Sequence, residues 1–216
     1  MKALFLDIAS NTGCLACVTN DRTVHLEAID HRIDDSAFTV LIEEVIKKAG
    51  WSLKDLTHIA CVMGPGGFTS LRVGVAAANA LAYGLGIAVA GVHLSDVYAA
   101  RFLQVQSSKL ETNSNSGKVL KKENIVWLHS TKKTQLFVRL FNEDVSATRC
   151  VNLDELKSVL QSGSWTGELL LAHKKVVEQL GLKEAELRPL EEVLPQLVAS
   201  ERYGKETILP WYGRGW

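Results

Sequence analysis

Short apolar runs and longer amphipathic runs alternate along the first half of the chain. Apolar runs bounded by turn residues predict strands, and runs whose apolar residues recur every three or four positions predict helices. The pattern predicts strands at 3–7, 14–19, 23–29, 59–63 and 88–92, and helices at 36–49 and 71–85. Asn20 and Asp21 are typical of a tight turn, so we expect the second and third strands to form an antiparallel hairpin. The later strands alternate with helices and are expected to be parallel.

The second half of the chain repeats this order less regularly, after a polar segment at 104–124 that predicts a loop. Strands are predicted at 125–128, 136–141, 148–151 and 169–172, with helices at 153–160 and 174–180. We therefore predict two tandem lobes, an N-terminal one over 1–103 and a smaller C-terminal one over 125–216. The predicted fold class is α/β, with the two-lobed actin/Hsp70-like (ASKHA) architecture. Each lobe should be ribonuclease-H-like, with a mixed sheet and helices.

The amino-acid composition limits which kinds of partner we expect the protein to bind. The chain carries 24 basic and 24 acidic residues, and 47% of its residues are hydrophobic, so it can build a core but has no global field that attracts nucleic acid or a membrane. Asp7 interrupts the apolar start, so we expect no secretory signal, and no run is long enough to span a bilayer. The four cysteines lie in apolar runs rather than in a disulfide-like framework. We expect a cytoplasmic protein.

Cys14 and Cys17 form a C-x-x-C within a predicted strand. Residues three apart on a strand point to opposite faces, and no second pair completes a four-ligand site. This pattern favours two buried apolar cysteines over a metal or redox site.

A glycine-rich turn joins the strand that ends at Met63 to the following alanine-rich helix. It reads Gly64, Pro65, Gly66, Gly67, Phe68 and Thr69, and the helix continues through Ser70, Leu71 and Arg72. Such a turn can present N–H groups to a close ligand, and a helix start there would favour an anion. The same residues suit an ordinary connection between strand and helix, and the loop has neither the Lys-Ser/Thr ending of a P-loop nor the glycine spacing of a dinucleotide fold. Spacing alone leaves both interpretations open.

The run from Met63 to Gly91 resembles the G-P-G-S-F-T-G-L-R-I-G signature and following helix of the bacterial TsaB (YeaZ) family. That family is the non-catalytic partner in threonylcarbamoyladenosine synthesis on tRNA. Leu4–Ser10 is similar to its opening I-L-A-I-D-T-S/A, Trp51–Leu56 to its W/G-x-x-L-x-D-L/I, and Leu209–Arg214 to its closing P-x-Y-x-R. Gly67 and Ser70 replace the signature serine and second glycine, which indicates a divergent member.

The resemblance implies a vestigial nucleotide or phosphate loop with no catalytic residue. Its members would be Asp7, Ser10, Thr12, Gly64, Pro65, Gly66, Gly67, Phe68, Thr69 and Arg72. No resident cofactor is expected, although a nucleotide at the partner interface is compatible with the resemblance. The catalytic paralogue, TsaD (YgjD), carries a metal-binding H-x-x-x-H motif; here His93 stands at its first position and Val97 at its second, so we expect no metal site.

The resemblance also implies that the first two long helices pair with their counterparts on the TsaD-type paralogue in a four-helix interface. The outward residues assigned to it are Val40, Glu44, Lys47, Arg72, Ala76, Asn79 and Tyr83. A TsaE-type ATPase would join the complex, and tRNA would be contacted indirectly through it. When alone, the chain could form a homodimer through the same helices.

The function implied is a non-catalytic activator of the enzyme that transfers threonylcarbamoyl to the adenosine beside the anticodon. The alternative is a small actin-fold ATP-dependent phosphotransferase or ATPase that uses Asp7 and the 64–69 loop around Mg-ATP. Peptidase activity has no Ser-His-Asp or Cys-His arrangement at interpretable spacing to support it.

Overall fold

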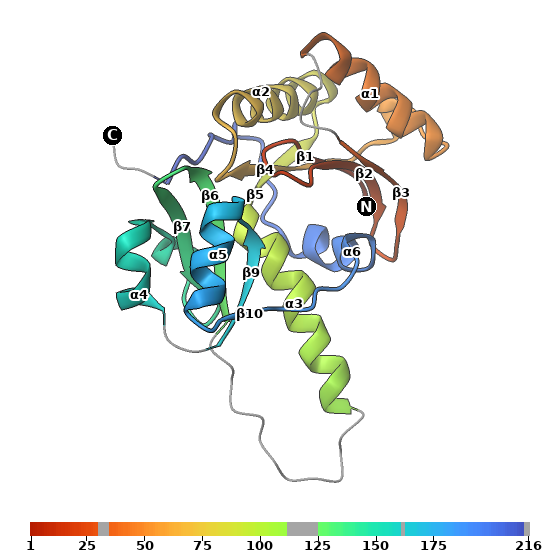
Figure 1. The fold of residues 1–216 in the computed structure, drawn as a ribbon. Helices are drawn as coiled ribbons and strands as arrows, with labels where there is room; N and C mark the ends of the chain where they lie inside the picture. The colour runs from red at the N-terminus through yellow and green to blue at the C-terminus, as the bar shows by residue number, and fades with distance from the viewer. Residues whose placement is uncertain (30–34, 112–124, 161–162, 214–216) are drawn as a thin grey trace. The chain divides into compact units, whose positions relative to one another are not determined.

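The computed structural model describes residues 1–29, 35–111, 125–160 and 163–213, which form two compact units (Figure 1). The first unit comprises Met1–Leu94 and Pro189–Tyr212, and the second comprises Ser95–Arg188 together with Gly213. This division differs from the predicted lobes 1–103 and 125–216 at both ends. Residues 95–103 group with the second unit, and the segment after Arg188 returns to the first. Among the described residues, no helix is long and apolar enough to cross a bilayer.

The first unit is built on a five-stranded sheet. Its strands are β1 (Lys2–Asp7), β2 (Cys14–Thr19), β3 (Thr23–Ala28), β4 (His58–Gly64) and β5 (Ala88–His93), in the order β3-β2-β1-β4-β5. The first three strands are antiparallel neighbours, while β4 runs parallel to β1 and β5 parallel to β4. The predicted hairpin and the predicted parallel strands are both confirmed.

Helices cover both faces of this sheet (Figure 1). On one face lie α1 (Asp35–Lys48) and α2 (Phe68–Leu85), and on the other lies α6 (Leu190–Ser200). A short 3-10 helix, η1 (Leu53–Asp55), precedes β4. Small residues let α2 lie close to the sheet: a Cβ on Gly74 would stand 3.0 Å from a side-chain carbon of Ile8. The helix ends at Leu85 and is capped by Gly86, whose φ of 67° is the left-handed conformation that glycine adopts without strain.

The second unit repeats the strand arrangement of the first. Its strands are β6 (Ile125–Lys132), β7 (Gln135–Leu140), β8 (Arg149–Asn152), β9 (Ser164–Glu168) and β10 (Lys183–Glu184), in the order β10-β9-β6-β7-β8. Again three strands are antiparallel neighbours, and β9 runs parallel to β6 and to β10. Its helices are α3 (Leu94–Glu111), α4 (Leu156–Val159) and α5 (Leu171–Gln179), with 3-10 turns η2 (Val145–Ala147) and η3 (Leu153–Glu155). Each unit is therefore a mixed sheet with helices, as predicted.

Three expectations for the second half were wrong. The strand predicted at 169–172 is the start of α5, and the strand lies earlier, at Ser164–Glu168. Gly167, with a φ of 122° inside that strand, breaks the apolar pattern that would have revealed it. Part of the predicted loop at 104–124 is helical, because α3 continues to Glu111; residues 112–124 lie outside the described residues. The helix predicted at 153–160 is a 3-10 turn followed by one turn of α4.

Candidate functional site

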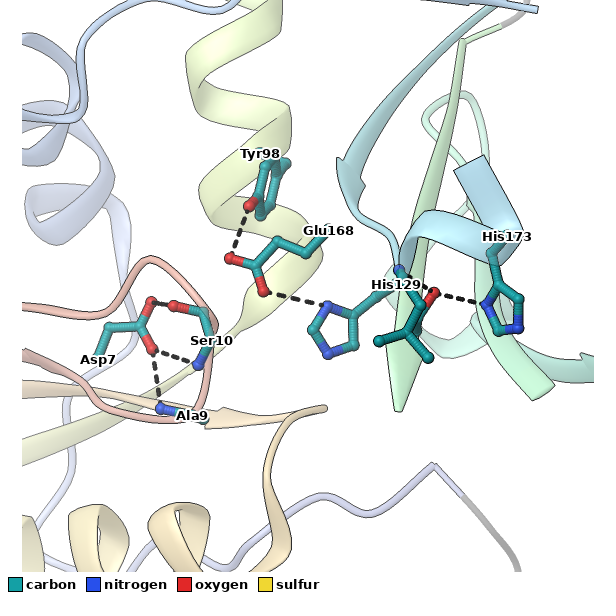
Figure 2. A network of polar contacts seen from close by, with 9 residues as sticks. Asp7, Ala9, Ser10, Tyr98, His129, Glu168 and His173 are labelled. Carbon is teal, nitrogen blue, oxygen red and sulfur yellow. Dashed lines mark hydrogen bonds and ion pairs between the residues drawn. The ribbon is translucent and has the colours of Figure 1, made fainter. Parts of the chain in front are cut away.

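The turn between β1 and β2 is closed by the carboxylate of Asp7, which is 3% exposed. Its Oδ1 accepts hydrogen bonds from the backbone N–H groups of Ala9 and Ser10, both at 3.1 Å, and its Oδ2 accepts one from the Ser10 hydroxyl at 2.7 Å (Figure 2). A buried carboxylate is costly unless such donors surround it. Asp7 and Ser10 therefore hold each other and the turn in place.

The glycines of the 64–69 turn allow two other segments of backbone to approach. A Cβ on Gly64, whose φ is 132°, would stand 2.2 Å from the carbonyl oxygen of Trp211. A Cβ on Gly66 would stand 2.3 Å from the carbonyl oxygen of Ala9, which accepts a hydrogen bond of 3.1 Å from the Gly67 N–H. Both contacts involve backbone atoms, so a side chain at Gly64 or Gly66 would displace the main chain.

These contacts bring together most of the predicted nucleotide loop and show what its residues do in this structure. Asp7 and Ser10 join the Gly64–Gly67 turn through Ala9, whereas Thr12, Phe68, Thr69 and Arg72 are exposed. Pro65 is buried behind a cis peptide bond. Within the described ranges no group of three or more His, Cys, Asp or Glu side chains could hold a metal ion. The glycine turn packs against the main chain of Ala9 and Trp211.

The outer surface of α2 carries an aromatic and cationic cluster at its N-terminal end. The Arg72 guanidinium carbon lies 3.9 Å from the centre of the Phe68 ring, and the Arg72 Nε donates a hydrogen bond of 2.9 Å to the Tyr212 hydroxyl. The Phe68 and Tyr212 rings are 5.2 Å apart. We call Phe68, Arg72 and Tyr212 the arginine cluster. It continues along the helix surface through Ala76 to Tyr83, which is 91% exposed.

Asn79 differs from the other residues assigned to this surface. Its Nδ2 donates to the carbonyl of Ile208 at 2.9 Å, and its Oδ1 accepts from the Ile208 N–H at 3.0 Å. The amide of this half-buried side chain is thus engaged with the chain's own C-terminal segment. Val40, Glu44 and Lys47 on α1 are exposed, as are Arg72, Ala76 and Tyr83 on α2.

The segment 203–212 runs across the first unit and was not predicted to reach α2. Gly204 and Val89 exchange backbone hydrogen bonds at the edge of the sheet, and the Trp211 N–H donates to the carbonyl of Met63 at 2.7 Å. The Trp211 ring meets the His93 ring edge to face, with centres 4.5 Å apart. Tyr212 follows directly and completes the arginine cluster. The P-W-Y-G run was the sequence signal, but a separation of 140 residues from Arg72 hid the contact.

The second unit contains a buried polar network (Figure 2). The Tyr98 hydroxyl donates to Glu168 Oε1 at 3.0 Å, and Glu168 Oε2 lies 3.6 Å from His129 Nδ1. His129 also stacks on Trp127, with ring centres 5.6 Å apart. Burial lowers the pKa of His129, although the neighbouring Glu168 opposes this change. The sequence gives no sign that His129 and Glu168 are partners, because only the register of β6 and β9 brings them together.

Ser130 and His173 form a second buried pair that sequence analysis missed. The Ser130 Oγ is 2.7 Å from His173 Nδ1 and accepts a hydrogen bond from the Leu170 N–H. His173 Nε2 is 2.8 Å from the carbonyl of Lys133, which can only accept, so Nε2 carries the proton and Nδ1 accepts from Ser130. The hydroxyl therefore ties the end of β6 to the start of α5. Ser130 is 7% exposed and His173 is not exposed at all, so this pair links the two elements inside the second unit.

Cys14 and Cys17 are buried free thiols on β2. The Cys17 Sγ lies 3.8 Å from the carbonyl of Val45, and burial raises its pKa to about 12. A thiol with that pKa stays protonated at neutral pH and is a poor metal ligand or nucleophile.

Part of the chain is similar in sequence to two kinds of named protein. Residues 31–112 match the family model described as "TsaD: tRNA N6-adenosine threonylcarbamoyltransferase". The tRNA N6-adenosine threonylcarbamoyltransferase of Geotalea uraniireducens is 41% identical over 81 residues, which are 37% of this chain and 21% of that protein. The tRNA threonylcarbamoyladenosine biosynthesis protein TsaB of Escherichia coli is 32% identical over 94 residues, which are 43% of this chain and 40% of that protein. The chain thus spans less than half the length of either relative.

Two solved structures from Pseudomonas aeruginosa share the fold over nearly the whole chain. An uncharacterized protein with similarity to peptidase YeaZ aligns with a TM-score of 0.66 at 18% identity and covers 99% of both chains. YeaZ itself aligns with a TM-score of 0.61 at 16% identity and covers 92% of this chain and 91% of that one. The predicted class of fold is confirmed.

Proposed function

We propose that this chain is a divergent member of the TsaB/YeaZ family and a non-catalytic subunit in the threonylcarbamoyladenosine modification of tRNA. In this role it forms a heterodimer with the TsaD-type paralogue through α1 and α2 and activates that enzyme in the cytoplasm. A TsaE-type ATPase joins the pair, and tRNA is bound through the complex. Without its partner, the chain forms a homodimer through the same helices.

The observation that carries this proposal is the exposed surface of α2. Phe68 is 57% exposed and Tyr83 is 91% exposed, and the small Ala76 lies between them on the same side of the helix. Exposed aromatic and arginine side chains are typical of the energetic centre of protein interfaces, and a small residue lets another helix approach closely. Val40, which is 54% exposed on α1, adds apolar surface on the same face of the sheet (Figure 1).

The contacts of the glycine turn support the non-catalytic part of the proposal. In an actin-fold ATPase the first-strand aspartate must hold a metal-bound water, and the adjacent turn must donate to phosphate. Here the Asp7 carboxylate accepts three hydrogen bonds from its own turn, and the Gly67 N–H donates to Ala9. These bonds occupy three of the roughly four acceptor sites of the carboxylate, and the Gly67 N–H would have to give up its bond to Ala9 before it could donate to phosphate.

An ATP-dependent phosphotransferase remains the second candidate, since the actin-like fold brings Asp7 and Ser10 to the end of β1. If the protein is such an enzyme, the purified wild-type chain should hydrolyse ATP, and the Asp7→Asn variant should not. ATP binding without turnover would not support this alternative.

The test of the first candidate is co-purification with the TsaD-type paralogue from the same genome. A stable heterodimer is expected for the wild type, and Ala76→Arg should weaken it at least about 30-fold, as the loss of an interface hot spot would. Ala199→Arg is the matched control, because Ala199 is an exposed alanine on α6, on the opposite face of the sheet. Failure of the wild type to form a complex with or without ATP would refute the proposed function. Equal effects of the two variants would refute the assigned surface.

A further inference from the structure

The arginine cluster holds one cation in a fixed position on an otherwise apolar surface. The Phe68 ring lies under the guanidinium, and the Tyr212 hydroxyl accepts from its Nε. Arginine has five N–H donors. Among the residues that the structure describes, no acceptor is within hydrogen-bonding distance of the two terminal amino groups, which carry the other four. These two groups form the planar fork that binds an oxyanion through two parallel hydrogen bonds.

The cluster also removes part of the cost of binding. A free arginine side chain loses conformational entropy when it is fixed. Here the ring beneath it and the hydrogen bond to Tyr212 already restrict the guanidinium before a ligand arrives. A receptor organised in advance binds more tightly than a mobile side chain with the same donors.

The surroundings favour a protein carboxylate over a phosphate. Phe68, Tyr83 and Leu209, which is 74% exposed, are among the large apolar side chains on the surface of the first unit. Arg72 is the one cation among the three residues of the arginine cluster. Phosphate groups of nucleotides are usually held by several donors or a metal ion, whereas one arginine beside aromatic rings matches the single charge of an aspartate or glutamate.

We propose that Arg72, held by Phe68 and Tyr212, is the receptor for an aspartate or glutamate side chain on the surface of the TsaD-type partner. This inference rests on the proposed function and adds to it the chemistry of one contact. It also gives the C-terminal segment a part in recognition, because Tyr212 belongs to that segment and orients the guanidinium.

The test is the dissociation constant of the heterodimer, measured by calorimetry at low and high salt for the full-length chain. Arg72→Met keeps much of the apolar contact with Phe68 but removes the charge, and should weaken binding about tenfold or more and flatten the salt dependence. Arg72→Lys keeps the charge without the planar fork and should also weaken binding. Tyr212→Phe keeps the ring but removes the acceptor, and should weaken binding by a smaller factor. Arg22→Met, on the exposed turn between β2 and β3, is the control and should bind as the wild type does.

The possible outcomes separate this inference from the proposed function. If the wild type forms the heterodimer and Arg72→Met binds equally well, the carboxylate receptor is wrong while the heterodimer stands. If Arg72→Met loses binding of ATP or inorganic phosphate but keeps the heterodimer, the ligand of Arg72 is a phosphate and the inference is overturned. If the wild type forms no heterodimer, both are wrong. Thermal unfolding of each variant confirms that it is folded.

Discussion

The carbonyl oxygen of Ala9 lies 2.3 Å from the position that a Cβ on Gly66 would occupy. The oxygen belongs to the main chain of Ala9 and the Cβ position is fixed by the main chain of Gly66, so neither can move aside by rotating a side chain. The contact joins the turn after β1 to the turn before α2, and it is reinforced by the hydrogen bond from Gly67 to the same carbonyl. The start of α2, which carries the arginine cluster, is therefore positioned by the N-terminal strand.

Gly66→Ala should destabilise the protein by about 1–3 kcal/mol, because the new methyl group would force the two turns apart. Gly84→Ala is its matched control: nothing lies within 4 Å of a Cβ at that helical position, so the same change should stabilise the protein by about 0.5–1 kcal/mol. Urea denaturation of the two variants measures both changes. Equal stabilisation by both substitutions would contradict the close approach of Ala9.

Asn79→Ala should release the segment around Ile208. The substitution removes both hydrogen bonds that join Asn79 to the Ile208 backbone, each of which contributes about 1 kcal/mol. The Ile208 amide should then exchange its hydrogen with solvent about tenfold faster or more. The Trp211 amide, bonded to Met63, is the internal comparison and should change less. Unchanged protection of Ile208 would show that other contacts hold the segment.

His129 should make stability fall as the pH is lowered. Burial lowers its pKa in the folded state below the ordinary value near 6.5, so the unfolded chain binds a proton more readily than the folded one. The contribution is present above about pH 6.5 and is lost as the pH falls below it. Urea midpoints between pH 7.5 and 5 should show this slope, and His129→Gln should flatten it. The half-buried His25 provides the control, since His25→Gln should leave the slope from His129 in place.

Ser130→Ala should cost about 1–3 kcal/mol of folding free energy, because it leaves the buried His173 Nδ1 and Leu170 N–H without the hydroxyl they share. Ser158→Ala, at an exposed serine on α4, should cost less than about 0.5 kcal/mol. Thermal unfolding compares the two. A stable Ser130→Ala variant that lost a hydrolytic activity of the wild type would reverse the structural assignment of this pair.

The sequence was most informative where local pattern and local structure agree. The strands of the first unit and the helix after the glycine turn follow from apolar periodicity and from turn residues such as Asn20 and Asp21. The strand at Ser164–Glu168 escaped prediction because Gly167 interrupts it, and the apolar run that follows favours a strand although it starts a helix. The apolar residues after Glu168 favour a strand by their local propensity, but the packing of the folded unit places them at the start of α5.

In the candidate site, too, the residues in local motifs could be predicted from the sequence, whereas the long-range contacts could not. Asp7, Ser10 and the glycines were found from sequence because they lie in short motifs. Tyr212 and the Asn79–Ile208 pair were not, since contacts between residues more than a hundred positions apart leave no local pattern. Sequence could name the residues of the turn but not the backbone atoms against which its glycines pack.

The return of 189–212 to the first unit affects the order in which the chain can fold during synthesis. Helix α6 supplies the buried Val193, Leu194 and Val198, and the carbonyl of Glu191 accepts a hydrogen bond from Thr23 on β3. Ribosomes release a chain from its N-terminus, and domains generally fold as units. Within this sequence, the strands of the first unit are synthesised before Ser95–Arg188, whereas α6 is synthesised after it. The sheet of the first unit therefore gains the helix that covers its second face only after Ser95–Arg188 has been synthesised.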